Sequence, residues 1–160
     1  MKVGPDEVRR RVNAFREATR ASGVKLTHQR LEIFEEIAGS SEHPSAERVF
    51  QGVRERVPTV SRDTVYRTMR LLQDLGLVTT VGPRRDSVRF DANLAPHHHY
   101  VCLGCGLTED FENPDYDGLH VPEAVRSFGS VTGTQVEVHG LCTRCASASH
   151  GGSETPAPGS

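Results

Sequence analysis

The chain of 160 residues contains no tryptophan, and aromatic residues make up only 6% of it. It also lacks an apolar run of the roughly 20 residues that a bilayer-spanning helix needs. Its first residues, Met-Lys-Val-Gly-Pro-Asp-Glu, are soon followed by three arginines instead of the apolar stretch of a secretion signal. These absences argue against a membrane partner and predict a cytoplasmic protein.

Positive charge is almost absent from the second half of the chain. Residues 1–90 hold 17 of the 19 Lys and Arg residues and 12 Asp and Glu residues, whereas residues 91–160 hold 2 and 9. The formal charges of the two segments are therefore +5 and −7. A basic segment suits a polyanion, because Lys and Arg release the counterions of phosphates. An acidic segment with clustered His suits a cation, although two ordinary solvated surfaces would carry the same charges.

Composition and charge together divide the chain into three segments. We expect a domain suited to a polyanion over residues 1–90 and a domain suited to a cation over residues 91–146. Residues 147–160 are rich in Ser, Gly, Pro and Ala, and we expect them to form a disordered tail because such a composition cannot bury a core.

Four amphipathic helices are expected in the first domain, because apolar residues recur there at intervals of three or four. Their predicted inward faces are Val8, Val12 and Phe15; Leu31, Phe34, Ile37 and Ala38; Ala46, Val49, Phe50 and Val53; and Val65, Met69 and Leu72. Thr27, Ser45 and Ser61 are the expected N-caps of the last three helices. Pro58 interrupts the pattern before the fourth helix, and Gly76 ends that helix.

Two short strands are expected next, over residues 77–81 and 87–91, with a turn at 82–86. Two helices with a tight connection form a helix-turn-helix, and a hairpin that follows is a wing. The buried stripe of the fourth helix leaves four side chains free for a DNA major groove: Arg62, Tyr66, Arg67 and Arg70. Arg84 and Arg85 at the wing tip are expected to contact the DNA backbone or minor groove. Because exposed arginines are often merely solvated, this pattern alone leaves nucleic-acid binding open.

The four cysteines of the chain form two Cys-x-x-Cys pairs, Cys102 with Cys105 and Cys142 with Cys145. Four thiolates can close a tetrahedral zinc site with no open position, which makes the site structural rather than catalytic. Disulfides are an alternative, but a reducing compartment opposes them. A redox-active pair is another, but it needs a thiol at a helix N-terminus in a strand–helix setting. The spacing favours structural zinc and a protein that is not an enzyme.

A run of three histidines, His97 to His99, precedes the first cysteine pair. In a strand, His97 and His99 face one side and His98 the other. Two imidazoles on one face suit a divalent first-row metal, with carboxylates as further ligands, although a row of His can also be only a solvated strand. Three candidate partners lie elsewhere in the sequence: His43, Asp91 and Asp110. A site with ligands from both halves of the chain would fix the orientation of one domain against the other.

Several of these motifs together resemble the ferric uptake regulator family, over roughly residues 10–146. The matching stretches are residues 26–30, 43–46, 61–77 and 97–99, together with both cysteine pairs. The resemblance implies an α+β protein with an N-terminal winged helix-turn-helix domain. It also implies a small C-terminal α/β dimerisation domain with a four-cysteine zinc site. Members of the family are homodimers that bind double-stranded promoter DNA and repress transcription when metal is bound.

The peroxide-sensing repressors of this family carry a regulatory site of three His and two Asp. Those positions correspond here to His43, Asp91, His97, His99 and Asp110. Iron-responsive members more often have Glu among the carboxylates, and zinc-responsive members tend to have Cys in place of Asp91. The resemblance thus implies a peroxide-sensing repressor with structural Zn²⁺ and regulatory Fe²⁺ or Mn²⁺, since nitrogen and oxygen ligands suit the latter ions. An iron- or manganese-responsive repressor is the alternative, and a zinc-responsive regulator is less favoured.

The sequence departs from the family pattern in a few places. His28 replaces the usual Pro of Thr-Pro-Gln-Arg, and the segment between Gly129 and Cys142 is shorter than usual. An auxiliary metal site of iron-responsive members is poorly matched, since Pro96 replaces a His ligand. A different second site remains open, formed by His98, Asp117 and His120.

Two other classes of function fit parts of the sequence. A thiol oxidoreductase would use the Cys-x-x-Cys pairs, but it leaves the basic half unexplained. A metal carrier or store would use the His and Cys clusters, but it does not need exposed arginines on a recognition helix.

Overall fold

The computed structural model describes residues 3–82, 88–131 and 133–150. The chain divides into two compact units, an N-terminal unit of residues 1–95 and a C-terminal unit of residues 96–160. None of the helices in the described part of the chain has both the length and the apolar character needed to cross a bilayer.

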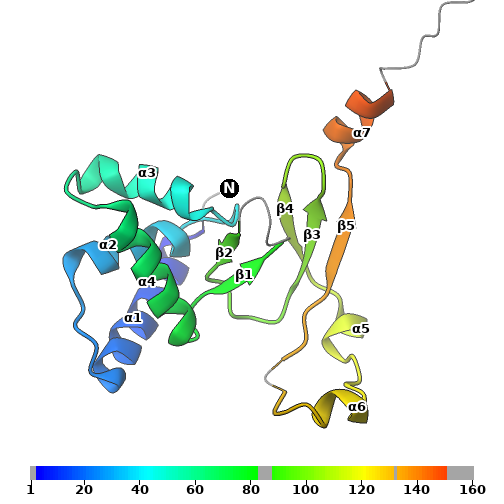
Figure 1. Cartoon of the computed structure of the whole chain (residues 1–160), viewed down its shortest axis with the longest axis horizontal. Coiled ribbons are helices and arrows are strands. Elements are labelled where there is room, and N and C mark those ends of the chain that lie inside the picture. Colours follow the sequence, from blue (N-terminus) through cyan, green and yellow to red (C-terminus); the bar gives the residue numbers. More distant parts are fainter. Residues whose placement is uncertain (1–2, 83–87, 132, 151–160) are drawn as a thin grey trace, which may run out of the picture. The chain divides into compact units, whose positions relative to one another are not determined.

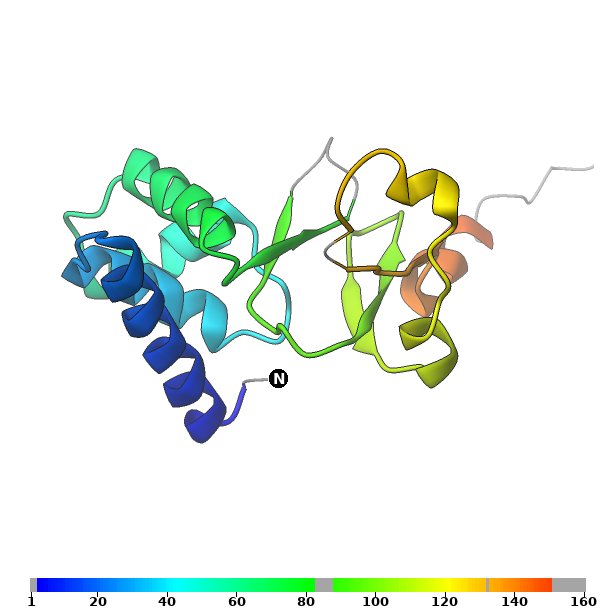
Figure 2. The same ribbon diagram turned by 90° about the horizontal axis from the view of Figure 1, so that it is seen from below.

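In its described residues, the N-terminal unit has four helices and a two-stranded sheet. The elements are α1 (Pro5–Ser22), α2 (His28–Ala38), α3 (Ala46–Arg56), α4 (Arg62–Asp74), β1 (Thr79–Val81) and β2 (Arg89–Asp91). The strands are antiparallel, with Thr80 paired to Phe90. Figures 1 and 2 show this hairpin at one edge of the helices. The helix pair α3–α4 followed by the hairpin is the predicted helix-turn-helix with its wing.

The three predicted N-caps are confirmed. The side-chain oxygens of Thr27, Ser45 and Ser61 each accept a hydrogen bond from the backbone N–H three residues further along the chain. Gly76 follows the end of α4 with a φ of 68°, a conformation that glycine adopts without strain. These local signals set where α2, α3 and α4 begin and where α4 ends.

The core of the N-terminal unit is formed by the predicted inward faces of the helices. Phe15 and Phe34 lie at its centre, with ring centroids 4.8 Å apart. Val8 and Leu31, which were expected to be buried, are only partly so, whereas Ile33 is fully buried. The helical period is therefore correct, but the buried stripe of α2 is centred on Ile33, Phe34 and Ile37.

The wing strands are shorter than predicted. Leu77 and Val78 are buried in the core but precede β1, which begins at Thr79. The predicted turn and the two arginines at its tip, Arg84 and Arg85, fall mostly at residues 83–87, outside the described residues.

The C-terminal unit is a small mixed sheet with short helices at its two ends. Its elements are β3 (His98–Cys102), β4 (Thr108–Phe111), α5 (Pro114–Asp117), α6 (Glu123–Arg126), β5 (Glu137–Gly140) and α7 (Thr143–His150). The strand order is β4-β3-β5, in which β3 is antiparallel to β4 and parallel to β5. Figure 1 shows α5 and α6 at one end of this sheet and α7 at the other. The helices and sheets of the two units confirm the predicted α+β class.

The last described helix, α7, includes residues 147–150, which the composition assigned to the disordered tail. The segment contains two Ser, one Ala and one His, and it continues a helix that begins between the two cysteines of the second pair, so hydrogen bonds along the helix extend into it. Composition therefore indicates disorder only where no helix or strand continues into the segment from the residues before it.

Candidate metal sites and nucleic-acid interface

The two cysteine pairs come together in the C-terminal unit. Their four sulfur atoms all lie within 4.8 Å of one another, and all four cysteines are free thiols. Pairing of β3 with β5 brings the end of β3 close to the start of α7, and the backbone N–H of Leu103 donates to the carbonyl of Gly140. A Cβ atom at Gly104 would lie 3.0 Å from the sulfur of Cys145, so glycine allows the close approach. Four sulfurs at these distances suit one tetrahedral zinc ion.

The electrostatics of this cluster also favour a cation. Backbone N–H donors, that of Cys142 foremost, lower the pKa of the Cys102 thiol to about 6. The pKa of Cys145 is raised to about 12, because its thiol is hydrogen-bonded to the sulfurs of Cys142 and Cys105 and lies beside the sulfur of Cys102. In the protein alone, the neighbouring sulfurs therefore oppose ionisation of the Cys145 thiol together with that of Cys102. A bound divalent cation would allow them to ionise, as metal ligation by cysteine requires.

Within the N-terminal unit, His43 and Asp91 face each other. His43 Nε2 lies 3.7 Å from Asp91 Oδ2, while Asp91 Oδ1 accepts a 2.7 Å hydrogen bond from the backbone N–H of Asn93. The pair is held by the backbone, since Phe90 N–H donates to the carbonyl of Pro44. His43 has a φ of 49°, a left-handed conformation that is uncommon for residues other than glycine and is often found at functional sites.

Within the C-terminal unit, His97, His99 and Asp110 converge on one point. The Nε2 atoms of His97 and His99 are 2.9 Å apart. Asp110 Oδ1 lies 3.4 Å from His99 Nε2 and 3.8 Å from His97 Nε2, because Asp110 is opposite His99 in the β3–β4 ladder. Two imidazoles and a carboxylate with their ligand atoms this close suit a divalent first-row ion.

His98 points to the other face of β3, as strand alternation predicts. Its Nε2 atom lies 3.1 Å from Asp117 Oδ1, and its ring packs against Phe111 and Tyr116. In the described part of the chain, no group of three potential metal ligands includes His98, Asp117 or His120. The second metal site that the sequence left open therefore gains no geometric support.

The four predicted DNA contacts on α4 differ in their surroundings. Tyr66 is 57% exposed, and the Arg67 side chain is 81% exposed and forms an ion pair with Asp63 on the same helix. Arg70 is also exposed. Arg62 instead forms two hydrogen bonds, of 3.0 and 2.8 Å, with the carboxylate of Glu47 on α3.

Arg62 is held further by an aromatic ring. Its guanidinium carbon lies 4.5 Å from the centroid of the Phe50 ring, a cation–π arrangement. The hydrogen bonds from Arg62 keep the pKa of Glu47 below its ordinary value. Arg62 therefore joins α4 to α3, a role that its position on the exposed helix face did not indicate.

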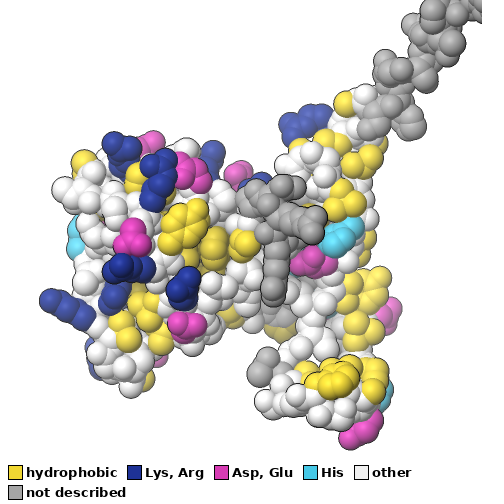
Figure 3. Space-filling model, viewed as in Figure 1, with side chains coloured by type: hydrophobic (Ala, Val, Ile, Leu, Met, Phe, Trp, Pro, Cys, Tyr) yellow, Lys and Arg dark blue, Asp and Glu magenta, His cyan; other side chains and the backbone are white. Residues whose placement is uncertain are grey.

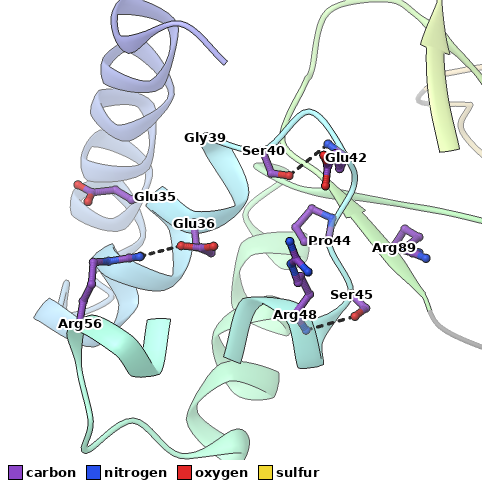
Figure 4. Close-up of a pocket in the computed structure, with 10 residues that line it drawn as sticks. All are labelled: Glu35, Glu36, Gly39, Ser40, Glu42, Pro44, Ser45, Arg48, Arg56 and Arg89. Atoms are coloured by element: carbon purple, nitrogen blue, oxygen red, sulfur yellow. Dashed lines mark hydrogen bonds and ion pairs between the residues drawn. The ribbon is translucent and has the colours of Figure 1, made fainter. Parts of the chain in front are cut away.

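A cavity of about 840 Å³ also lies in the N-terminal unit, beside α2 and the start of α3 (Figure 4). Its lining carries both signs of charge: Glu35, Glu36, Gly39, Ser40, Glu42, Pro44, Ser45, Arg48, Arg56 and Arg89. Arg56 is already paired with Glu36 at 2.8 Å and with Glu32 at 2.9 Å. This mixture of charges favours neither an anion nor a cation.

Comparison with known proteins gives a consistent picture. Residues 21–145 match the model of the ferric uptake regulator family. The chain is 33% identical over 127 residues to the peroxide-responsive repressor PerR of Staphylococcus epidermidis, covering 79% of this chain and 84% of that protein. It is 31% identical over 126 residues to PerR of a Staphylococcus aureus strain, covering 79% and 85%.

Solved structures agree at the level of the fold. The ferric uptake regulator of Helicobacter pylori superposes with a TM-score of 0.70 at 21% identity, covering 92% of this chain and 96% of that one. The ferric uptake regulator of Vibrio cholerae superposes with a TM-score of 0.63 at 26% identity, covering 79% and 98%. The arrangement of helices and strands is therefore that of this group of structures.

Proposed function

The chain belongs to the ferric uptake regulator family, and on that premise we propose that it is a DNA-binding repressor that senses peroxide through an Fe²⁺ or Mn²⁺ site. The chemistry of the ligand set carries the proposal. The five candidate ligands are three imidazoles and two carboxylates, with no thiolate among them. Such ligands suit Fe²⁺ or Mn²⁺, whereas thiolates select zinc. The relatives named as peroxide-responsive repressors support the peroxide part of the proposal.

The proposed regulatory site takes ligands from both units. His43 and Asp91 come from the N-terminal unit, and His97, His99 and Asp110 come from the C-terminal unit. Three neutral imidazoles and two carboxylates would leave a divalent ion formally neutral, which limits the cost of burying it. With ligands on both sides, metal binding would favour one orientation of the units, to the extent that this orientation binds the ion more tightly.

Peroxide would release this restraint through the ligands themselves. Bound Fe²⁺ would supply the one-electron chemistry that reduces hydrogen peroxide, and by resemblance the oxidation would fall on His43 or His97, with one peroxide oxygen added to the ring and the other released as water. An imidazole that gains one oxygen atom loses basicity at its nitrogens and becomes a poorer ligand. The two units would then lose their common ligand set, and with it the arrangement that binds DNA. Mn²⁺ does not readily undergo the same one-electron chemistry, so manganese-loaded protein would resist peroxide.

The four cysteines are proposed to hold a structural Zn²⁺ that supports a homodimer. The C-terminal unit exposes many large apolar side chains: Leu103, Leu107, Leu119, Val125, Phe128, Val131, Val138 and Leu141. Phe128 is the extreme case, at 87% exposed. Figure 3 shows apolar side chains over α5, α6 and β5, whereas most of the Lys and Arg side chains in view lie over the N-terminal unit. A second copy of the chain would cover this apolar surface.

Double-stranded promoter DNA is the proposed partner of α4. Tyr66, Arg67 and Arg70 are exposed and available for base edges or phosphates. Arg62 would contribute to DNA binding by holding α4 against α3, and would reach a phosphate only if its pair with Glu47 opens. A partner of this kind implies that the protein acts in the cytoplasm. Family members are regulators rather than enzymes, so a thiol oxidoreductase is not retained as an alternative.

The test is promoter-DNA binding by zinc-replete protein loaded with Fe²⁺, Mn²⁺ or Zn²⁺, each before and after brief treatment with hydrogen peroxide. We expect binding to depend on metal and to be lost after peroxide only with Fe²⁺. Mass spectrometry should find one added oxygen on the peptides that carry His43 or His97, in step with the lost binding. Binding that survives peroxide with iron bound would favour the second candidate, an iron- or manganese-responsive repressor. Loss through zinc release and cysteine oxidation would make the four-cysteine cluster the sensor instead.

A further inference from the structure

The loop before β5 places an amide beside one of the candidate metal ligands. Gln135 Nε2 lies 2.9 Å from Nδ1 of His99, although the two residues are 36 positions apart. The backbone fixes the approach, because the N–H of His99 donates to the carbonyl of Val136 at 3.1 Å. We propose that Gln135 is a positioning residue for the regulatory metal, acting through His99. The inference rests on the proposed function, since it assumes that His99 binds a metal.

The two nitrogens of the His99 ring face different partners. Nε2 lies 2.9 Å from Nε2 of His97 and 3.4 Å from Oδ1 of Asp110, so it belongs to the converging ligand atoms. Nδ1, on the other side of the ring, meets Gln135. An imidazole that binds a metal through Nε2 keeps its proton on Nδ1. A hydrogen-bond acceptor at Nδ1 therefore fixes the ligating tautomer, orients the ring and makes Nε2 more basic.

The amide of Gln135 can form a hydrogen bond with Nδ1 of His99 in both neutral tautomers of the imidazole. When Nδ1 has no proton, the NH₂ group of Gln135 donates to it; when Nδ1 is protonated, the amide turned by half a rotation accepts from it. Gln135 thus satisfies His99 before metal binding and after it. A carboxylate at this position would accept only, and would favour the tautomer that binds metal. An apolar side chain would offer Nδ1 no partner in either form.

The position of Gln135 argues against a role in packing. Gln135 is exposed in the loop, and its amide still reaches the ring of His99, which is buried in β3. Glu137, two residues further along the chain in β5, lies opposite His99 in the β3–β5 ladder. Its carboxylate is directed to His139 instead, with Oε2 3.0 Å from His139 Nε2. The amide of Gln135 is thus aimed at the ligand set from outside it, where it would act on the affinity for a divalent first-row ion.

The experiment measures the affinity of full-length, zinc-replete protein for Mn²⁺ by competition with a chelator. The variants are Gln135→Met, which keeps the length of the side chain without its hydrogen bond, Gln135→Glu, which keeps an acceptor, and Thr134→Ala as a control in the same loop. We expect Gln135→Met to weaken Mn²⁺ binding by about 10- to 100-fold, the usual cost of losing such an outer partner. Gln135→Glu should bind at least as tightly as the wild type, and Thr134→Ala should match it.

A second measurement reads the hydrogen bond itself. Nitrogen-15 NMR of the His99 ring, in protein with zinc at the cysteines and no regulatory metal, should show a changed tautomer ratio in Gln135→Met and a shift toward the Nδ1–H form in Gln135→Glu. Unchanged Mn²⁺ affinity in Gln135→Met, or equal weakening in Gln135→Glu, would overturn the proposal. If the wild type binds no Mn²⁺, the proposed function fails, and the NMR spectra still decide whether Gln135 controls the His99 tautomer.

Discussion

The two units of this chain are stabilised in different ways. In the N-terminal unit, all four helices direct apolar side chains into one continuous core, which extends from Val12 to Ala92. In the C-terminal unit, Val101 and Cys102 are the only buried apolar residues among those the structure describes. Many of its large apolar side chains lie at the surface instead.

The proposed function assigns DNA binding to the unit with a continuous apolar core, and metal sensing to the unit with few buried apolar residues. Small domains with little apolar burial usually need a metal, a disulfide or a partner to fold. The C-terminal unit has the four-cysteine cluster and the exposed apolar surface to use two of these, zinc and a second copy. Its stability is therefore expected to depend on metal and on assembly, whereas that of the N-terminal unit is expected to depend on its core.

The largest expected effect comes from a substitution at the zinc site, which should affect the C-terminal unit and spare the N-terminal unit. Cys142→Ser removes one of four clustered ligands, so stoichiometric zinc and the dimer should both be lost, while the helices of the N-terminal unit remain. Elemental analysis, sedimentation and circular dichroism measure the three outcomes. Thr143→Ala, next to the removed ligand, is the control and should behave as the wild type. A folded, zinc-free dimer of Cys142→Ser would contradict this view of the C-terminal unit.

A substitution in the core of the N-terminal unit should have the opposite result, destabilising that unit and sparing the C-terminal unit. Phe34 is 1% exposed and packs against Phe15, so Phe34→Ala should destabilise the N-terminal unit by about 3–5 kcal/mol. Urea denaturation followed by helicity gives the free energy of unfolding. The zinc content and the dimer should be retained, because they belong to the other unit. Concerted loss of helicity, zinc and dimer in this variant would mean that the units do not fold separately.

Smaller effects are expected at the surface of α4. Arg67→Ala should weaken binding to a specific duplex by about 1–3 kcal/mol if Arg67 contacts a guanine, with little change for a scrambled duplex. Arg62→Ala is the matched comparison, since Arg62 is joined to Glu47, and it should weaken both duplexes alike. Fluorescence anisotropy with both duplexes distinguishes these patterns. Equal affinity of Arg67→Ala and wild type for both duplexes would remove Arg67 from the interface.

The smallest expected effect concerns pH and the first helix. Hydrogen bonds from Arg11 and Arg10 keep the pKa of Glu7 below its ordinary value of 4.5. A lowered pKa in the folded state contributes stability above that ordinary value, and the contribution is lost as the pH falls through the folded value. Glu7→Gln should therefore lower the free energy of unfolding by less than about 1 kcal/mol at pH 7, and by less still in acid. Glu17→Gln, on the exposed face of α1, is the matched control in the same denaturation experiment.

Local features of the fold could be predicted from the sequence, and long-range contacts could not. Thr27, Ser45 and Ser61 act within three residues of their own positions, so their capping roles could be recognised from neighbouring residues. Arg62 was interpreted from its helix face alone, and its partner Glu47 lies on another helix. The centre of the α2 stripe at Ile33 depends on which helices pack around it, which the helical period does not specify.

The candidate sites show the same division. The spacing of Cys-x-x-Cys identified two pairs, but their closure into one cluster depends on the parallel pairing of β3 with β5. The alternation of a strand placed His97 and His99 on one face, and Asp110 was a candidate partner from its residue type and place in the sequence. The β3–β4 register, which the sequence did not specify, brings Asp110 opposite His99. Gln135 had no signal in the sequence, because an isolated glutamine in a loop acquires a role only when the fold brings it to His99.

The most direct test of the proposed mechanism compares two carboxylates, one from each unit. Mn²⁺ affinity should be measured in zinc-replete wild-type protein, Asp91→Ala and Asp110→Ala. If one ion takes ligands from both units, each substitution should weaken Mn²⁺ binding strongly and abolish metal-dependent DNA binding, with the zinc content unchanged. If Asp91→Ala binds Mn²⁺ as tightly as the wild type while Asp110→Ala does not, the C-terminal unit holds the ion alone, and metal binding cannot set the orientation of the two units.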